Sequence, residues 1–316
     1  MRILFATDGS ENAAEAAGLL ARFKALQPMD ITFLSVTYDP DPDTEAVRPW
    51  YPEYRKHIEE RVENHFHRIQ ELLQTATRNA HMLHLHGNPT KRILEAVEQV
   101  QPDLLVLGAR GHSALESLLL GSVSEAVTSR ASCSVLVMRP RDGELERDPC
   151  EPKKILLACD GSKQSDMAGQ ELLSLVKSHE AEVDILAVAT SPPYLFGEYT
   201  YAGDWPEQLA TLERVLAKES LRYANSRGKV ETHAGTANHV GDTIVKYATE
   251  TAADLIILGE SGHNAFEKLF LGSTTKFVLR HADCSVWISR TPAWKSDAEV
   301  NEPAQTKELE FSASTA

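Results

Sequence analysis

The sequence contains two copies of one pattern, and this repeat limits the possible folds more than any other feature. The segment ILFATDGSENAAEAAGLLARF (3–23) aligns with ILLACDGSKQSDMAGQELLSL (155–175) at an offset of 152. Further along, LLVLGARGHSALESLLLGSVSEAV (104–127) aligns with LIILGESGHNAFEKLFLGSTTKFV (255–278) at an offset of 151. With 316 residues the chain is long enough for two domains. We therefore expect two copies of one domain in a single polypeptide.

The composition between and after the two copies sets the expected domain boundaries. The stretch RPRDGELERDPCEP is rich in proline and charge and lacks apolar periodicity, which is typical of a surface linker. The last residues are rich in Glu, Ser, Thr and Ala with few large apolar side chains, which favours disorder. We expect a first domain at 1–140, a linker at 141–152, a second domain at 153–290 and a disordered tail at 291–316.

Each copy alternates short apolar strands with helical patterns. In the first copy the apolar run ITFLSV (31–36) precedes a predicted helix at about 54–76, where Ile58, Val62 and Ile69 recur at helical spacing. This alternation predicts an α/β fold of two tandem open-sheet domains, each a five-stranded parallel sheet flanked by helices, of Rossmann-like type. The predicted strands lie near 3–7, 31–36, 81–86, 103–108 and 134–139, and near 155–159, 183–188, 229–234, 254–258 and 285–289.

The charge balance argues against polyanionic partners. Lys and Arg total 32 against 46 Asp and Glu, so the formal net charge is −14. Binding to nucleic acid or to an anionic membrane depends on Lys and Arg that neutralise phosphates. We therefore expect neither nucleic acid nor membrane among the partners.

Cysteine usage and the first residues favour a reducing cytoplasm. The N-terminal apolar run in MRILFATDGS is too short for a signal peptide or a membrane anchor, and no later run reaches the length of a membrane span. Cys133, Cys150, Cys159 and Cys284 form no CxxC pair, which argues against a disulfide framework and a cysteine zinc site. We expect Cys133 and Cys284, which occupy equivalent positions before a buried strand, to pack in the core.

A glycine pattern that occurs in both copies predicts an anion site. Gly108, Gly111 and Gly121 recur at the same spacing as Gly259, Gly262 and Gly272. In each set the first glycine ends a buried strand and the last opens a helix. A helix N-terminus offers unpaired N–H groups and a partial positive charge, which suit a phosphate. The alternative is that each Gly-Ser pair only starts a helix, with serine as its cap.

Polar side chains accompany this pattern at the same predicted sheet edge. Asp8 and Asp160 end the first strand of each copy, where a carboxylate can accept a hydrogen bond from a ribose hydroxyl or hold a divalent cation. An aspartate that caps the next helix is the alternative, and both roles are compatible. Hydroxyl donors on the first turn of the later helices are Ser122, Ser124, Ser273 and Thr275.

Several catalytic signatures do not occur in the sequence. There is no GxxxxGK[ST] phosphate loop, no GxGxxG after the first strand, no GxSxG elbow and no HExxH helix. Neither glycine loop carries an evident base or arginine finger for phosphoryl transfer. The sequence therefore favours binding over turnover.

With these motifs the chain resembles a tandem member of the universal stress protein family. The resemblance covers about residues 1–140 and 152–290, and it rests on the strand-end Asp and the G-x2-G-x9-G-[ST] loop, each present twice. The ATP-binding branch of the family has an adenine nucleotide alpha hydrolase-like fold, and the resemblance implies ATP as ligand, with Mg²⁺ held by Asp8 and Asp160. A valine at the end of the second strand then contacts adenine through its backbone.

Carried over by position, the resemblance implies two sets of nucleotide-binding residues. The first set is Asp8, Val36, Leu107, Gly108, Gly111, Gly121, Ser122 and Ser124. The second set is Asp160, Val188, Leu258, Gly259, Gly262, Gly272, Ser273 and Thr275. The copies differ after the third strand, where HGNPTKRI (86–93) faces TANHVGDTI (236–244), so nucleotide coverage in the second copy is less well defined.

The resemblance also implies a function and an assembly. We expect an ATP-binding stress-response protein that acts as a nucleotide-dependent sensor or regulator; the alternatives are a slow ATP hydrolase and a nucleotide-free interaction scaffold. The last strands, CSVLVMR and CSVWISR, are candidates to pair the two domains, and a homodimer is expected.

Histidines lie near the predicted sites as well. His112 and His263 follow the second glycine of each loop, where each either approaches a phosphate or lies exposed. His84 and His86 share one face of a strand; a metal pair is one interpretation, and a solvated strand face is the simpler one.

Overall fold

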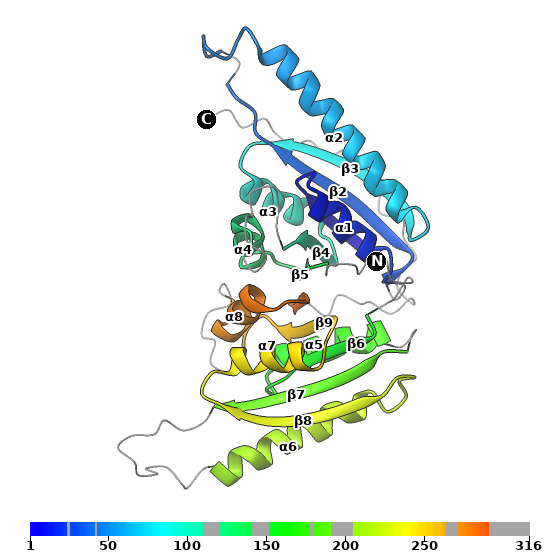
Figure 1. The fold of residues 1–316 in the computed structure, drawn as a ribbon, viewed down its shortest axis with the longest axis vertical. Coiled ribbons are helices and arrows are strands. Elements are labelled where there is room, and N and C mark those ends of the chain that lie inside the picture. The colour runs from blue at the N-terminus through cyan, green and yellow to red at the C-terminus, as the bar shows by residue number, and fades with distance from the viewer. Residues whose placement is uncertain are drawn as a thin grey trace, which may run out of the picture.

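A computed structural model describes residues 1–23, 26–41, 43–109, 120–140, 152–176, 180–190, 205–262 and 271–290. Apart from Pro152, the predicted linker lies outside the described residues, as does the predicted tail. The strands form one ten-stranded sheet in the order β3-β2-β1-β4-β5-β10-β9-β6-β7-β8, which runs through both halves of the molecule (Figure 1). Each half thus has the same strand order, which confirms the predicted tandem α/β fold.

The elements of each half follow one another in the predicted alternation. The first half contains β1 (Arg2–Thr7), α1 (Glu11–Leu20), β2 (Met29–Thr37), α2 (Tyr51–Leu73), β3 (Thr77–His86), α3 (Pro89–Val100), β4 (Leu104–Gly108), α4 (Ser122–Thr128) and β5 (Ser134–Met138). The second contains β6 (Lys154–Ala158), α5 (Lys163–Val176), β7 (Glu182–Thr190), α6 (Trp205–Arg222), β8 (Val230–Ala237), α7 (Val240–Glu250), β9 (Leu255–Gly259), α8 (Ser273–His281) and β10 (Ser285–Ser289).

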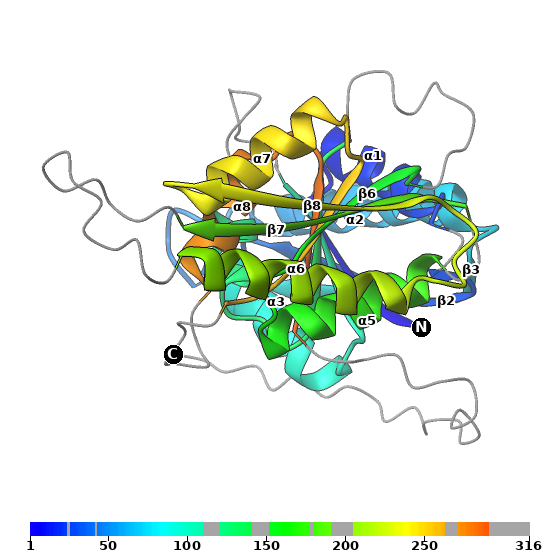
Figure 2. The ribbon, with the colours of Figure 1, turned by 90° about the horizontal axis from the view of Figure 1, so that it is seen from below.

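Helices cover both faces of the sheet, and each face has its own apolar core. Alternate residues of a strand point to opposite faces, so Ile3 and Phe5 lie in one buried cluster and Leu4 and Ala6 in the other. The first cluster packs under α1, α2, α5 and α6, and the second under α3, α4, α7 and α8. Figure 2 shows α6 and α7 on opposite sides of β7 and β8. Because both faces are covered, the strands read as nearly continuous apolar runs.

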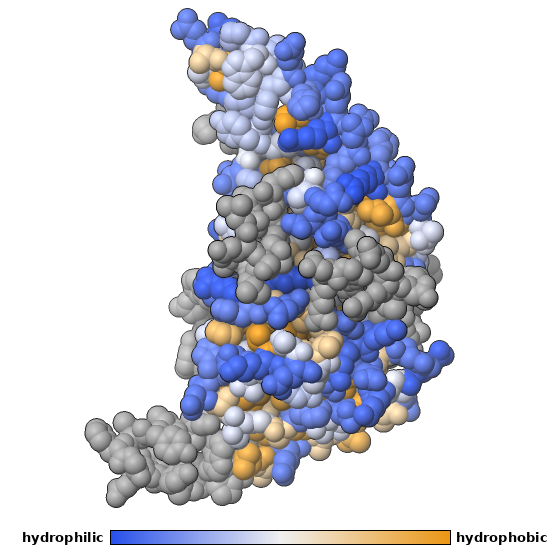
Figure 3. Space-filling view, viewed as in Figure 1, coloured by the Kyte–Doolittle hydropathy of each residue, from blue (hydrophilic) through white to orange (hydrophobic). Residues whose placement is uncertain are grey.

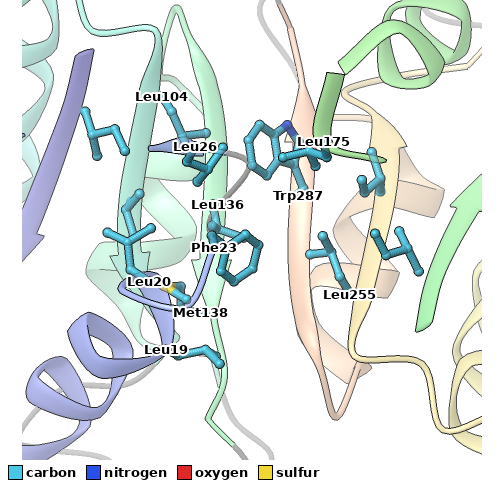
Figure 4. Close-up of a cluster of buried hydrophobic side chains, with 14 of the residues drawn as sticks. Leu19, Leu20, Phe23, Leu26, Leu104, Leu136, Met138, Leu175, Leu255 and Trp287 are labelled. Carbon is cyan, nitrogen blue, oxygen red and sulfur yellow. The ribbon is translucent and has the colours of Figure 1, made fainter. Parts of the chain in front are cut away.

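The two halves join through their last strands, as expected. β5 and β10 pair antiparallel, with Trp287 opposite Leu136, whereas the other strand pairs are parallel. Trp287 is fully buried, and Figure 4 shows it beside the seam, across from Leu136 and Phe23 of the first half. Pairing within the chain removes two sheet edges that would otherwise expose unpaired backbone groups.

Two arginines cross this seam in opposite directions. Arg139, after β5, donates from its guanidinium to the carbonyl oxygens of Ala282 and Leu279 at 2.7 and 2.8 Å, at the C-terminus of α8. Arg290, after β10, donates to the carbonyl oxygen of Thr128 at the C-terminus of α4. A cation at a helix C-terminus neutralises the carbonyl end of the helix dipole. The seam is therefore held by reciprocal polar contacts in addition to apolar packing.

The visible surface fits the acidic composition. The face in Figure 3 is largely hydrophilic, with small separate apolar patches. Among the described helices none is both long and apolar enough to cross a membrane.

Candidate functional site

The predicted site residues that the structure describes lie at the carboxyl ends of neighbouring strands of each half. β1 lies between β2 and β4, so the chain leaves β1 toward one side and later returns on the other. Ala6 of β1 is in register with Leu107 of β4, which brings Asp8 and Gly108 to the same edge of the sheet. In the second half β6 and β9 are paired in the same way. Such a switch point is where open α/β sheets bind ligands.

The aspartate loops have one geometry in both halves. Gly9 and Gly161 adopt φ of 80° and 81°, in the left-handed region that glycine tolerates. This turn lets Asp8 Oδ1 accept a hydrogen bond from Ser10 N at 3.0 Å, and Asp160 Oδ1 one from Ser162 N at 2.9 Å.

The helix caps are the serines that follow these aspartates. Ser10 Oγ accepts from Ala13 N, and Ser162 Oγ accepts from Ser165 N, both at 3.2 Å. The alternative that the aspartates cap the helices is therefore wrong. Each carboxylate instead forms an Asx turn at the sheet edge.

In the second half the glycine loop passes directly over the aspartate. A Cβ on Gly262 would lie 2.5 Å from Asp160 Oδ2, and one on Gly259 would lie 2.8 Å from the main-chain carbon of Gln164. The backbone contact makes glycine necessary at Gly259, whereas a side chain at Gly262 would displace the Asp160 carboxylate. In the first half Gly111 lies outside the described residues, as do His112 and His263.

Glycine begins the helix at the end of each loop. Gly121 and Gly272 are the N-caps of α4 and α8, and neither helix start has a side-chain cap hydrogen bond among the described residues. The cap N–H groups are used, because Gly121 N donates to Ala109 O and Gly272 N to Glu260 O, both at 2.8 Å. The next three N–H groups have no partner within the helix and remain for water or an anion.

The hydroxyl groups on these first turns divide into two kinds. Ser124 Oγ donates to Gly108 O at 2.7 Å, and Thr275 Oγ1 donates to Gly259 O at 2.8 Å. Their protons are therefore directed at the strand ends, where they fasten each helix to its strand. Ser122 and Ser273 are exposed.

The predicted adenine side is partly apolar. Leu107 and Leu258 are buried, while Val36 and Val188 are half-buried near the ends of β2 and β7. Beyond Val36, Thr37 Oγ1 lies 2.8 Å from His84 Nε2 and 3.1 Å from His86 Nδ1. These histidines are half-buried and bound to Thr37, so the strand face that carries them is partly solvated.

The surroundings of His84 favour its neutral ring. The ring centroids of His84 and His86 are 4.6 Å apart. Burial, reinforced by the neighbouring His86, lowers the pKa of His84 below its usual value.

The two halves differ in sequence after their third strand, but in both a side chain at this place caps the next helix. In the first half Asn88 caps α3 through its side chain, which accepts from Lys91 N at 3.1 Å. In the second half His239 caps α7, with Nδ1 accepting from Asp242 N at 3.1 Å. Both helices therefore start at the same place beside the site.

Sequence reasoning missed an ion pair at the second loop. Arg290 Nε donates to Glu260 Oε2 at 2.9 Å, and the same guanidinium contacts Thr128 O of the other half. The position of Glu260 in the first loop is Ala109, so the two loops differ here. The contrast between GARG and GESG was visible in the sequence, but the arginine partner follows a strand 30 residues further on.

Comparisons with known proteins agree with the repeat. Residues 1–139 and 151–290 each match the model of the universal stress protein family. A protein named as a universal stress protein in Staphylococcus haemolyticus is 31% identical over 141 residues, which are 44% of this chain and 85% of the relative. That relative therefore corresponds to one of the two halves.

Solved structures resemble the whole chain. A universal stress protein from Archaeoglobus fulgidus has a TM-score of 0.64 at 23% identity, over 92% of this chain and 98% of that one. A protein from Pseudomonas aeruginosa described as a universal stress protein has a TM-score of 0.57 at 13% identity, over 92% and 94% of the two chains. These likenesses concern the fold.

Proposed function

Because this chain belongs to the universal stress protein family and carries two of its domains in tandem, we propose that it is an ATP-binding stress-response protein that acts as a nucleotide-dependent sensor or regulator. A cytoplasmic location and a homodimer are part of this proposal. The observation that supports it best is the close approach of Gly262 to the Asp160 carboxylate beside the start of α8.

The arrangement suits a nucleotide because it offers different chemistry at its two ends. The first-turn N–H groups of α4 and α8, with the exposed Ser122 and Ser273, suit phosphate oxygens. Asp8 and Asp160 suit a ribose hydroxyl or Mg²⁺, for which carboxylate oxygens are common ligands. Glycine at position 262 avoids a side-chain clash with the Asp160 carboxylate, to which the proposal assigns a ribose hydroxyl or a metal.

In this proposal each predicted residue has a defined part. Gly108, Gly111, Gly121, Gly259, Gly262 and Gly272 shape the phosphate loops. Ser124 and Thr275 hold the helix starts in place through the hydrogen bonds described above. Leu107, Leu258, Val36 and Val188 form the adenine side.

A sensor also needs a path from the ligand to the rest of the molecule. The second loop carries Glu260, whose partner Arg290 contacts the C-terminus of α4 in the first domain. Nucleotide that favours one position of this loop shifts the Arg290 contacts, provided that its affinity differs between the two arrangements.

Binding of ATP to the tag-free full chain tests the proposal. Equilibrium dialysis with labelled ATP and Mg²⁺ is expected to give two nucleotides per chain, and Asp8→Ala and Asp160→Ala are each expected to remove or weaken one. ATP at about 100 times its Kd is expected to stabilise the chain by about 2.7 kcal/mol. Absence of binding and of a thermal shift would contradict the proposal and support a scaffold, whereas phosphate release that requires both aspartates would support a slow hydrolase.

A further inference from the structure

A second group of polar side chains lies in the second domain, away from the glycine loops. Asp184 on β7 is in register with Glu231 on β8, and His233 lies two residues further on the same face of β8. One ligand atom from each of the three side chains lies within 4.8 Å of the others. These residues belong to the amino-terminal halves of their strands, whereas the glycine loop begins at the carboxyl end of β9. The group is therefore separate from the proposed nucleotide site.

Asp184 is an unusual residue for its place in the core. It is only 3% exposed, in a strand whose next residues are Ile185 and Leu186. A buried carboxylate is costly unless a positive charge compensates it. Lys154 Nζ lies 3.3 Å from Asp184 Oδ2 and serves one of its two oxygens.

The other oxygen of Asp184 faces an imidazole nitrogen that lacks a hydrogen bond. His233 Nε2 lies 3.7 Å from Asp184 Oδ1, which is too long for a hydrogen bond. This nitrogen is itself buried and has no hydrogen-bond partner among the described residues. A buried acceptor or donor in this condition destabilises the fold unless a ligand satisfies it.

Neighbouring side chains contact the three residues, and the Tyr247 hydroxyl also hydrogen-bonds to Asp184. Lys229 Nζ lies 2.8 Å from Glu231 Oε1, which leaves the second oxygen of that carboxylate for another ligand. The Tyr247 ring packs 5.1 Å from the His233 ring, and burial together with the charge of Asp184 raises the pKa of Tyr247, so that it stays neutral. Outer partners of this kind fix the direction of metal ligands.

The first domain shows that the fold does not require this group. The register of the strands places Thr32, His81 and Leu83 at the positions of Asp184, Glu231 and His233. In the sheet of the first domain these positions are thus filled by a hydroxyl side chain, an exposed imidazole and an aliphatic side chain, without a buried carboxylate. The unsatisfied His233 nitrogen beside the buried Asp184 carboxylate therefore needs another explanation.

We propose that Asp184, Glu231 and His233 bind a divalent transition-metal ion of the Zn²⁺ class. One imidazole nitrogen and two carboxylate oxygens form a donor set that Zn²⁺ accepts, whereas Mg²⁺ and Ca²⁺ prefer oxygen ligands alone. Zinc ligands lie at about 2.0–2.2 Å from the ion, so small side-chain rotations bring the three atoms into place. The ion compensates Asp184, satisfies His233 and fastens the edge strand β8 to β7.

Zinc uptake by the tag-free full chain, stripped with EDTA, tests this proposal. Calorimetric titration with Zn²⁺ alone is expected to show one site that His233→Leu and Glu231→Gln weaken by about a hundredfold or more. His84→Ala/His86→Ala is the matched control for adventitious histidine binding and is expected to retain the site. Absence of uptake by the wild type, or uptake unchanged in His233→Leu, would overturn the proposal.

A second measurement distinguishes a metal site from a simple histidine–aspartate ion pair. His233→Leu copies Leu83 of the first domain and removes the unsatisfied nitrogen, so in EDTA it is expected to unfold at the same or a higher urea concentration than the wild type. Added Zn²⁺ is then expected to raise the urea midpoint of the wild type only. A variant that is less stable than the wild type in EDTA would assign His233 to an ion pair and overturn the proposal. Nucleotide binding does not enter either measurement.

Discussion

The two domains share a strand order and a loop geometry but differ in where they bury charge. Each has the same Asx turn and the same hydroxyl bond from the late helix to the strand end. At three positions the second domain has Glu171, Asp184 and Glu260 where the first has Leu19, Thr32 and Ala109. The duplicated site thus keeps its geometry, while the second domain has gained carboxylates that contact the seam, the edge strand and the loop.

The seam illustrates this difference best. Glu171 on α5 is 2% exposed and accepts hydrogen bonds from Trp287 Nε1 and from Ser134 Oγ of the first domain, each at 2.6 Å. On the other side Leu19 occupies the position of Glu171, and the labelled side chains near it and near Leu136 in Figure 4 are apolar. The joint between the domains is therefore asymmetric although the strands are related by a repeat.

The largest expected loss of stability follows from removing the Trp287 indole ring at the seam. Trp287→Ala is expected to lower the free energy of unfolding by about 3–5 kcal/mol, because it leaves a cavity and removes a donor from Glu171. Leu136→Ala, the matched change, is expected to cost about 2–5 kcal/mol. Urea unfolding measures both, and a smaller loss for the tryptophan would contradict the asymmetric seam.

The next effect depends on pH. Burial raises the pKa of Glu171 from 4.5 to about 7, against the hydrogen bonds from Ser134 and Trp287, which lower it. The folded state therefore binds the proton more tightly than the unfolded state, so stability falls as pH rises from about 4.5 to about 7. At 1.36 kcal/mol per pKa unit, the free energy of unfolding is expected to fall by roughly 3 kcal/mol over this pH range.

Glu171→Gln is expected to remove this pH dependence. Unfolding curves at pH 5 and pH 8 for both proteins measure the difference, and Leu19→Met provides a control on the other side of the seam. Parallel pH profiles for the wild type and Glu171→Gln would show that the carboxyl does not titrate in this range.

Removing the loop carboxylate is expected to have a moderate effect. Glu260→Ala makes the second loop like the first and leaves the largely buried Arg290 without its ion-pair partner, at a cost of about 1–3 kcal/mol. Ala109→Glu in the first domain is the reciprocal change. Thermal unfolding gives the stability, and the ATP affinities of both sites show whether the pair couples them; unchanged affinity at the first site would limit its role to packing.

The smallest expected loss of stability concerns a hydrogen bond that both domains share, from a hydroxyl group on the late helix to the end of a strand. Ser124→Ala and Thr275→Val each remove one hydroxyl bond to a strand-end carbonyl, so each is expected to cost about 1 kcal/mol. Equal losses in urea unfolding would support a common fastening role. A loss in only one domain would show that the two helix starts differ.

Much of the fold can be predicted from local patterns in the sequence. The buried carboxylates that distinguish the two domains cannot be predicted in this way. Apolar strands such as ITFLSV and the repeated glycines depend on local rules, namely side-chain alternation and turn geometry, and these predicted the elements and the sheet edge. Glu171 and Asp184 look like ordinary polar positions, because their burial depends on distant partners: those of Glu171 are 37 and 116 residues away, and His233 is about fifty residues from Asp184. Tertiary contacts of this range leave no periodic signal.

The antiparallel joint between β5 and β10 has a consequence for any ligand that occupies both domains. Since each half is parallel and the halves run in opposite directions, the two candidate sites lie at opposite rims of one continuous sheet. A ligand or partner that contacts both candidate sites must therefore reach from one rim of the sheet to the other. In the proposed function, a signal between the two candidate sites passes through the β5–β10 joint in the middle of the sheet.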